Sequence, residues 1–247
     1  MILDIDVGNS FVKWRLTDGV EIRQFGSQAT KSIDPRRGLD VPEEFPISQV
    51  RLSSVAANSV QKDLVAQVKS QFNAEVTLAK VSSVAAGVRC GYADPSSLGV
   101  DRWLAALGAW KLYQRPLLII NAGTAITIDL IDIGKEGKAH FKGGMILPGI
   151  AISLAVLNNS TNLIDTEIGK NHYPGINTAD AVTTGIFKSI QGAVNLVCKK
   201  LPSTLPILLT GGDASLIYEQ VENDWKSRIK LEDNLIFEGL MFYLENH

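Results

Sequence analysis

Two short segments of this 247-residue chain join a glycine to polar side chains directly after an apolar run. In the first, the strand-like segment 1–7 runs into Asp6-Val7-Gly8-Asn9-Ser10, and Lys13 follows. A glycine in a tight turn lets a phosphate approach the backbone, and turn N–H groups can donate to its oxygens. Asp6 at the strand end is placed to hold Mg²⁺, directly or through water. Taken alone, the segment is more typical of a plain hairpin turn.

The second segment, Asn121-Ala122-Gly123-Thr124-Ala125, repeats the pattern. Residues 2–9 lie over residues 117–124, and in each half a second strand follows at once. Two such hairpins can clamp the phosphates of a nucleotide from two sides. This plan resembles that of the actin, sugar-kinase and heat-shock ATPase class. The chain has no G-x-x-x-x-G-K-[ST] motif, which excludes a P-loop kinase.

A third glycine pair, Gly211-Gly212, stands between the apolar run 207–210 and a predicted helix that starts at Ala214. A strand that runs into two glycines and then a helix brings the backbone close to a ligand at the helix N-terminus. In the same class this region packs on the adenosine. An ordinary strand-to-helix turn explains the pair equally well.

The most distinctive stretch is Leu98-Gly99-Val100-Asp101-Arg102-Trp103, at the start of a predicted helix. Asp101 near a helix N-terminus is a good cap, and this plain interpretation stays open. Arg102 opposes the helix dipole there, so its position suggests a ligand anion, and a guanidinium can bind a carboxylate through two parallel hydrogen bonds. Asp101 beside it could then accept a proton from a hydroxyl group.

The elements that would position these residues follow the same order in both halves: three strands, then alternating helix and strand. The N-terminal half predicts strands at 1–7, 11–16, 20–25, 50–55 and 76–81, helices at 59–72 and 101–113, and a proline-rich charged loop from residue 35 to 46. The C-terminal half predicts strands at 117–121, 124–133, 139–147 and 207–210, and helices at 151–157, 178–201, 214–221 and 234–243. Such repetition indicates an internal duplication.

Composition places the chain among ordinary soluble globular proteins, because 45% of its residues are hydrophobic and 20% are charged. The formal net charge of −2 gives no basic excess, so we expect no nucleic-acid partner. Two cysteines form neither a secreted disulfide framework nor a metal-ligand spacing. No apolar run reaches the length of a membrane span, and the N-terminus lacks the basic start of a signal peptide. We expect a cytoplasmic protein without a membrane partner.

In combination, these motifs resemble the type III pantothenate kinase family, which is related to the Bvg accessory factor proteins. The resemblance spans essentially the whole chain in the family's order, and the G-x-D-R stretch is its most specific part. It is carried by Asp6 to Ser10, Gly99 to Arg102, Asn121 to Ala125, Gly143 to Gly149, Asn177-Thr178 and Leu209 to Asp213.

The resemblance implies an α/β fold of two ribonuclease-H-like domains, at 1–115 and 116–247, each a mixed sheet flanked by helices, with the final helix able to pack back on the first. It implies ATP-dependent phosphorylation of pantothenate to 4'-phosphopantothenate, with ATP and Mg²⁺, in a homodimer whose substrate site lies near the interface. It places ATP against Asp6, Val7, Gly8, Asn9, Ser10, Phe11, Val12, Lys13 and Thr124. It places pantothenate against Tyr92, Gly99, Val100, Asp101 (the catalytic base), Arg102, Thr178 and Asp180.

Two positions depart from the family pattern. The first hairpin has Ser10 where the family usually has Thr, which keeps the hydroxyl group. The second hairpin begins with Asn121 where the family usually has an Asp that holds K⁺ or NH₄⁺. A neutral amide oxygen is a weaker cation ligand than a carboxylate, so a monovalent cation at Asn121 is in doubt.

Two other functions are compatible with parts of the sequence. The hairpins alone fit a related kinase that phosphorylates another small alcohol, although the G-x-D-R stretch argues against it. A non-catalytic nucleotide-binding regulator of the accessory-factor kind is the second alternative. Asp6, Asp101 and Arg102 are all present, which favours an active enzyme.

Overall fold

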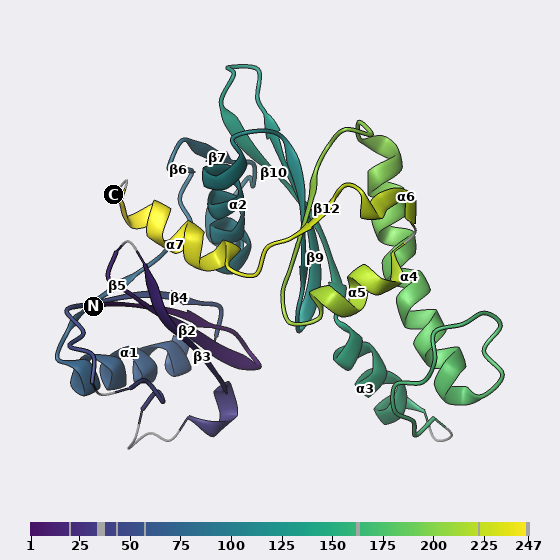
Figure 1. Ribbon diagram of the computed structural model, residues 1–247, viewed down its shortest axis with the longest axis horizontal. Coiled ribbons are helices and arrows are strands. Elements are labelled where there is room, and N and C mark those ends of the chain that lie inside the picture. Colours follow the sequence, from purple (N-terminus) through teal and green to yellow (C-terminus); the bar gives the residue numbers. More distant parts are fainter. Residues whose placement is uncertain are drawn as a thin grey trace. The chain divides into compact units, whose positions relative to one another are not determined.

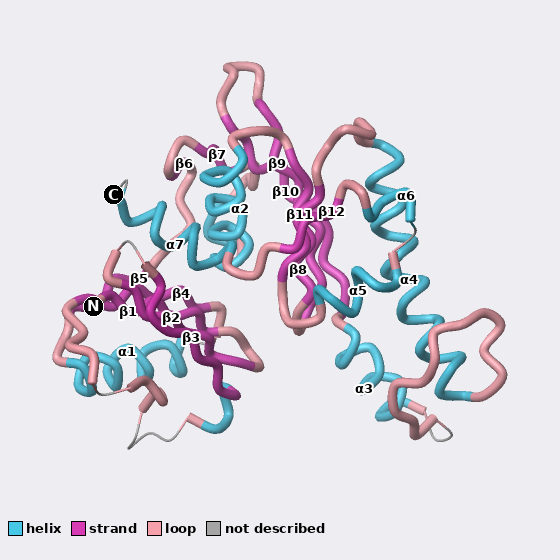
Figure 2. The backbone as a smooth tube through the Cα atoms, in the orientation of Figure 1, coloured by secondary structure: helices cyan, strands magenta, loops and turns pink. Residues whose placement is uncertain are grey.

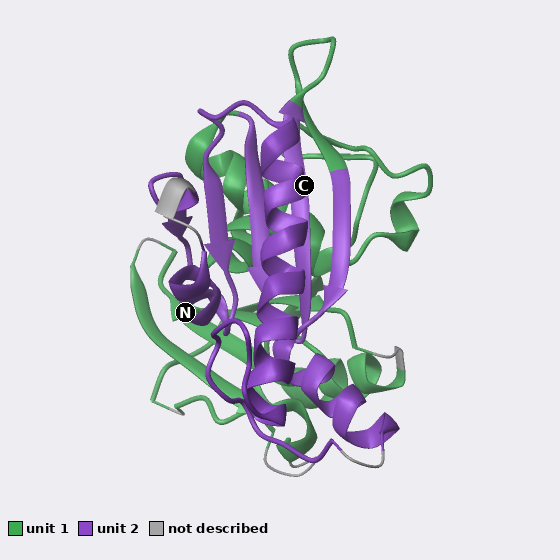
Figure 3. Ribbon diagram, turned by 90° about the vertical axis from the view of Figure 1, so that its right-hand side faces the viewer, with its two compact units in different colours: residues 1–115, 133–142, 234–247 green, residues 116–132, 143–233 purple. Residues whose placement is uncertain are grey.

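The computed structural model describes residues 1–19, 21–33, 38–42, 44–56, 58–161, 164–221 and 223–245 (Figures 1 and 2). Val20, at the predicted start of the third strand, lies outside the described residues, as do residues 35–37 and 43 of the predicted loop. The chain forms two compact units, one of residues 1–115, 133–142 and 234–247 and the other of residues 116–132 and 143–233 (Figure 3). The predicted domain boundary after residue 115 stays a prediction.

The first unit contains a five-stranded sheet in the order β3-β2-β1-β4-β5. β1 pairs antiparallel with β2 and parallel with β4, so the sheet is mixed, as predicted. The glycine of the Asp18-Gly19 turn has a φ of 97°, the left-handed conformation that this position requires. The strands are β1 (Ile2–Val7), β2 (Phe11–Thr17), β3 (Ile22–Ala29), β4 (Gln49–Ser54) and β5 (Glu75–Leu78).

Alternation along β1 sorts its side chains onto two faces. Leu3, Ile5 and Val7 are fully buried on the face that helix α1 (Asn58–Phe72) covers with Leu64 and Val68 (Figure 1). The other face carries the polar residues of β1. Strand β1 is therefore an apolar support on one side and a row of carboxylates on the other.

Asp4, the first carboxylate of that row, is buried but fully paired. It accepts hydrogen bonds from the Nε of Arg15 at 2.7 Å and from the Nε of Arg51 at 2.5 Å. Arg15 also donates to Glu238 of the final helix at 2.7 Å, and its guanidinium lies 5.3 Å from the ring of Phe237. A buried charge is tolerated only when it is paired in this way. The network ties the C-terminal helix to the central strand.

Two features of this unit differ from the sequence prediction. Strand β3 runs on to Ala29 instead of ending at Phe25, because it pairs with β2 along its length and the ring of Trp14 covers Gly26, where no side chain would fit. In the predicted charged loop, Leu39 and Val41 are buried in the core. The backbone N–H of Leu39 donates to the Oε1 of Gln71 at 3.0 Å, and the Nε2 of Gln71 donates to the carbonyl of Leu39 at 2.8 Å.

Helix α2 (Val100–Tyr113) packs against helix α7 (Leu235–Glu245) at backbone contact. A Cβ on Gly239 would lie 1.8 Å from the carbonyl oxygen of Leu104, and one on Gly108 would lie 2.2 Å from that of Leu235. Only glycine permits so close an approach. The first unit also holds the short elements η1 (Thr30–Ser32), β6 (Val84–Ala85), β7 (Val88–Cys90) and η2 (Pro95–Ser97).

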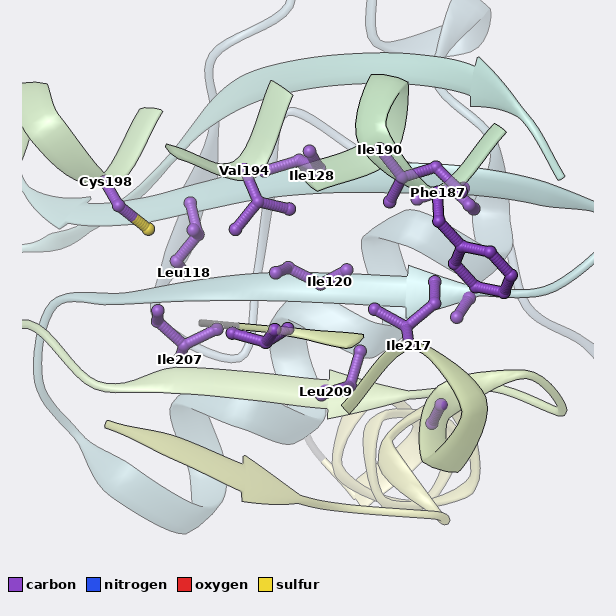
Figure 4. Close-up of a cluster of buried hydrophobic side chains, with 14 of the residues drawn as sticks. Leu118, Ile120, Ile128, Phe187, Ile190, Val194, Cys198, Ile207, Leu209 and Ile217 are labelled. Atoms are coloured by element: carbon purple, nitrogen blue, oxygen red, sulfur yellow. The ribbon is translucent and has the colours of Figure 1, made fainter. Parts of the chain in front are cut away.

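The second sheet has the order β12-β11-β8-β9-β10-β7-β6. Its apolar core is contributed by β8, β9, β11, α4 and α5, and its members include Ile120, Phe187 and Leu209 (Figure 4). The elements not yet named are β8 (Leu117–Ala122), β9 (Ala125–Ile133), β10 (Ala139–Pro148), α3 (Ile150–Ser160), α4 (Thr178–Lys200), β11 (Ile207–Thr210), α5 (Ala214–Gln220), α6 (Asn223–Lys226) and β12 (Ile229–Leu231).

The two sheets share one topology. The order β3-β2-β1-β4-β5 of the first returns in the second as β10-β9-β8-β11-β12, with β8 antiparallel to β9 and parallel to β11. The α/β class with mixed sheets flanked by helices is confirmed, and the shared order supports the predicted duplication, which stays a prediction. None of the helices in the described part of the chain is long and apolar enough to cross a membrane.

Candidate active site

The turn between β1 and β2 is held in place from two directions. The N–H of Gly8 donates to the carbonyl of Phe11 at 2.9 Å and closes the turn. From η1, the backbone N–H of Thr30 donates to Ser10 at 2.9 Å, and its hydroxyl group donates to the carbonyl of Gly8 at 2.9 Å. The N–H of Gly8 is thus used inside the turn, and phosphate contacts would have to come from its other groups.

Asp6 lies half-buried at the end of β1, opposite Lys13 on β2 and Ser53 on β4. Burial raises its pKa to about 6, although the hydrogen bond that Ser53 donates at 3.0 Å lowers it. The negative charge of Asp101 raises the pKa further, and the charge of Lys13 lowers it. Asp6 and Asp101, far apart in sequence, therefore act electrostatically on one another.

The carboxylate of Asp6 suits a divalent cation. Mg²⁺ in kinases is usually held by one or two carboxylates together with phosphate oxygens and water, rather than by a cage of protein ligands. Among the described residues no group of three or more His, Cys, Asp or Glu side chains is arranged to hold a metal. Asp6 fits the first kind of site, with phosphates as further ligands.

Asp101 is the second residue of α2, and the N-cap is Gly99, which has no side chain to cap the helix. The plain interpretation of Asp101 as the N-cap is therefore wrong by position. Its Oδ1 does accept from the backbone N–H of Arg102 at 2.8 Å, so it satisfies one donor of the first turn. A Cβ on Gly99 would lie 2.6 Å from the same Oδ1, which explains the glycine beside it.

Arg102 is only 5% exposed and lies beside two aromatic side chains. Its Nη1 donates to the hydroxyl oxygen of Tyr92 at 2.7 Å. Its guanidinium carbon is 5.7 Å from the centre of the Tyr92 ring and 5.8 Å from that of Phe141 on β10. Sequence reasoning named Tyr92 but missed Phe141, which reads as one more apolar residue of a strand.

The second glycine turn, in the other unit, is one residue shorter than the first. The N–H of Gly123 donates to the carbonyl of Ala125, two residues on, at 3.2 Å, whereas that of Gly8 donates to Phe11, three residues on. The carbonyl of Ala122 accepts from the N–H of Asp213 at 3.0 Å, as that of Val7 does from Val55 at 3.1 Å. The third glycine cluster is thus tied directly to the second turn.

Gly211 is needed for this join. Its φ is 101°, and a Cβ there would lie 2.2 Å from the carbonyl oxygen of Ala122 and 2.6 Å from the Oδ1 of Asn121. A Cβ on Gly212 would meet nothing within 4 Å. There is therefore open space on the Cβ side of Gly212 within its own unit. Next to it, burial raises the pKa of Asp213.

The two turns differ in charge. Across the first sheet, Asp6 stands between Lys13 and Ser53. At the matching position of the second sheet, Asn121 stands between Thr127 and Thr210. The second row is neutral, and the hydroxyl oxygen of Thr127 is buried without a hydrogen-bond partner among the described residues. The ionised groups of the predicted phosphate site lie on the first turn.

The predicted substrate residues near 180 lie at the start of α4. Asp180 is buried, and its Oδ1 accepts from the N–H of Lys170 at 2.7 Å, while the Nδ2 of Asn177 donates to its Oδ2 at 2.9 Å. Asn177 is the N-cap and accepts from the N–H of Asp180 at 2.8 Å. Asp180 therefore fastens the preceding segment to the helix and leaves Thr178 exposed. Contact of either residue with substrate stays a prediction.

A groove of about 920 Å³ runs between α3 and α4 of the second unit. Its lining is mainly apolar and includes Leu147, Val156 and Ile176 together with Thr178. Val156 is 54% exposed and Ile176 83% exposed, which is unusual for side chains of this size. The groove thus brings Thr178 next to uncovered apolar surface.

Solved structures with low sequence identity share this fold. A putative Baf family transcriptional activator from Campylobacter jejuni has a TM-score of 0.60 at 21% identity, covering 98% of this chain and 97% of that one. A putative 2-dehydro-3-deoxygalactonokinase from Sinorhizobium meliloti has a TM-score of 0.58 at 12% identity, covering 97% of both chains. The chain therefore has the fold of these two proteins, a mixed α/β architecture with a glycine turn in each sheet.

Sequence comparison identifies the protein family. The family profile of type III pantothenate kinase matches residues 2–200. A type III pantothenate kinase from Chromohalobacter salexigens is 40% identical over 227 residues, which cover 88% of this chain and 79% of the relative. One from Methylobacillus flagellatus is 34% identical over 252 residues, covering 99% and 97%. The chain belongs to the type III pantothenate kinase family.

Proposed function

We propose that this protein transfers the γ-phosphate of ATP to the primary hydroxyl of pantothenate and so makes 4'-phosphopantothenate, the first step of coenzyme A synthesis. The observation that carries the proposal is the family match over residues 2–200, supported by the effect of the Asp101 charge on the pKa of Asp6. The candidate metal ligand and the candidate base thus belong to the same unit.

In this proposal the nucleotide binds to the first glycine turn, where residues 6–13 contact ATP. Asp6 would hold Mg²⁺, with phosphate oxygens as further ligands. Contact of Thr124 with ATP stays a prediction. Phosphoryl transfer has a loose transition state, so catalysis rests on positioning and on charge stabilisation. The side chain of Lys13, opposite Asp6, adds a positive charge on the same row.

The acceptor binds at the start of α2. Asp101 orients the hydroxyl group of pantothenate and takes its proton as the bond to the γ-phosphorus forms and ADP leaves. Arg102 binds the carboxylate of pantothenate. Tyr92, Gly99, Val100 and Arg102 together form the pantothenate-binding wall. The buried, aromatic setting of Arg102 supports the assignment, because a guanidinium in such a setting interacts strongly with an anion.

Turnover of ATP with and without pantothenate tests the function directly. We expect ADP release to depend on pantothenate and to yield the phosphorylated product by mass spectrometry. ATP turnover with another small alcohol but not with pantothenate would indicate the related kinase instead. Nucleotide binding without turnover would indicate a regulator of the accessory-factor kind.

A monovalent cation at Asn121 stays a prediction. The neutral row of Asn121, Thr127 and Thr210 offers oxygen ligands but no carboxylate, which weakens the hold on a cation. Assays in K⁺, NH₄⁺ and a bulky organic cation would decide whether the activity depends on one.

A second copy of the chain is the proposed occupant of the groove between α3 and α4, and Thr178 would then reach pantothenate at the interface. The uncovered apolar side chains of the groove support this, since exposed patches of this kind usually mark protein contacts. We also propose that the protein is cytoplasmic.

Replacing Val156 by Lys tests the interface, because the charge would be buried against the partner. We expect a monomer by light scattering and a raised KM for pantothenate. Leu196→Lys is the matched control, since Leu196 is 55% exposed on α4 but does not line the groove. A Val156→Lys dimer with unchanged kinetics would contradict the proposed interface.

Arg102→Ala is expected to raise the KM for pantothenate about tenfold to a hundredfold, because losing a charged hydrogen-bonded partner costs ~1.5–3 kcal/mol. The KM for ATP should change little, and initial-rate kinetics with each substrate varied in turn would show the difference. An unchanged KM for pantothenate would mean that Arg102 binds another group.

A further inference from the structure

We infer that Phe141 is a positioning residue for the acceptor site: its ring holds the guanidinium of Arg102 in the orientation that receives a carboxylate. The inference rests on the proposed function, because it adds a residue to the pantothenate-binding wall. It assigns to a buried strand residue a role that its sequence context does not indicate.

Three segments of the first unit converge on the guanidinium. Tyr92 follows β7, Arg102 belongs to the first turn of α2, and Phe141 lies on β10. Parallel pairing of β7 with β10 sets Phe141 opposite Cys90, two residues before Tyr92. The register between the two strands therefore sets the rings of Tyr92 and Phe141 beside one another.

The contacts leave Arg102 little freedom. The ring centres of Tyr92 and Phe141 are 6.1 Å apart, and the guanidinium carbon lies within 6 Å of both. The hydroxyl group of Tyr92 accepts a hydrogen bond from the Nη1 of Arg102 at 2.7 Å. A cation over an aromatic face is attracted by the ring quadrupole, and the attraction grows as water is removed.

Phe141 is itself held rigidly. It is fully buried, and its ring meets that of Trp103 edge-on, at 85° and 6.2 Å between centres. Trp103 is the neighbour of Arg102 in α2 and is also fully buried. The wall that orients the guanidinium is thus fixed to the same helix that carries Asp101, so base and anion-binding group keep a constant spacing.

Phe141→Met tests the inference, because methionine fills a similar volume and has no ring face. We expect the KM for pantothenate to rise about five- to thirtyfold, with kcat and the KM for ATP nearly unchanged. The KM for an analogue whose carboxylate is replaced by a primary alcohol should not rise. Phe141→Tyr, which keeps the ring, should restore the KM for pantothenate.

The rise in the KM for pantothenate must also disappear when the guanidinium of Arg102 is removed. In the Arg102→Ala background, Phe141→Met should leave the KM for pantothenate unchanged. Phe237→Met is the matched control, since Phe237 is a buried phenylalanine beside another arginine, and it should lower the melting temperature without a selective change in that KM.

Two outcomes would overturn the inference and are distinct from failure of the proposed function. If Arg102→Ala raises the KM for pantothenate but Phe141→Met does not, Phe141 only fills the core. If the two substitutions multiply in the double variant, or if the alcohol analogue is affected equally, Phe141 does not act through Arg102. If Arg102→Ala itself has no effect on that KM, the assignment of Arg102 in the proposed function fails.

Discussion

Asp101→Asn is expected to lower kcat by about 10²–10⁴-fold, because the variant keeps shape and hydrogen bonding but cannot take up the proton of the acceptor hydroxyl. The amide oxygen of Asn can still accept from the N–H of Arg102, as the Oδ1 of Asp101 does at 2.8 Å. Helix α2 should therefore stay intact. Steady-state kinetics and thermal unfolding of the same preparation would show the two expectations together.

Asp94→Asn is the control for a capping role. Asp94 is the exposed N-cap of η2, and its side chain accepts from the N–H of Ser96 at 2.9 Å. Asn caps as well as Asp does, so this variant should keep its activity. If Asp101→Asn behaved like Asp94→Asn and turned over pantothenate at nearly the normal rate, Asp101 would be a structural residue of the first turn and no base.

Asp6→Asn should lower kcat/KM for MgATP by roughly 10²–10³-fold, since a metal ion contributes several kcal/mol of charge stabilisation in the transition state. Binding of pantothenate should change far less. Asp40→Asn, at an exposed carboxylate, is the control that leaves both unchanged. Near-normal MgATP kinetics in a folded Asp6→Asn protein would rule out Asp6 as the metal ligand.

The raised pKa of Asp6 adds a pH dependence to the same prediction. With a pKa of about 6, the carboxylate loses its charge as the pH falls through 6, so Mg²⁺ affinity should fall there, and Asp6→Asn should not show this step. The pKa of Asp6 is higher in the folded chain than in the unfolded chain, so protonated Asp6 favours the folded state. This contribution to the free energy of unfolding is lost as the pH rises through 6. Without metal, Asp6→Asn should therefore be at least as stable as the wild type at pH 8.

Much of this molecule follows from local patterns. Alternation in residues 1–7 predicted the strand, and glycines 8 and 123 marked turns that the structure closes with a hydrogen bond from the glycine N–H. The helical stripe of 178–201 matched α4 to within a residue. These features depend on spacings of two to four residues along one segment, which a single sequence displays completely. Elements of two to four residues, such as β6, β7, α6 and β12, are too short to show a period.

Long-range packing decided the rest. Leu39 joined the core from a stretch of charge and proline because Gln71 of α1, 32 positions away, binds its backbone. The pKa of Asp6 depends on burial and on Asp101, which lies 95 positions later. Phe141 became a neighbour of Arg102 only through the register of β7 with β10. Residue type and local period determined the secondary structure and the candidate chemistry of each segment. The distances between side chains of different segments are set only when the chain packs. The tertiary structure alone therefore decided which charges and rings act on one another.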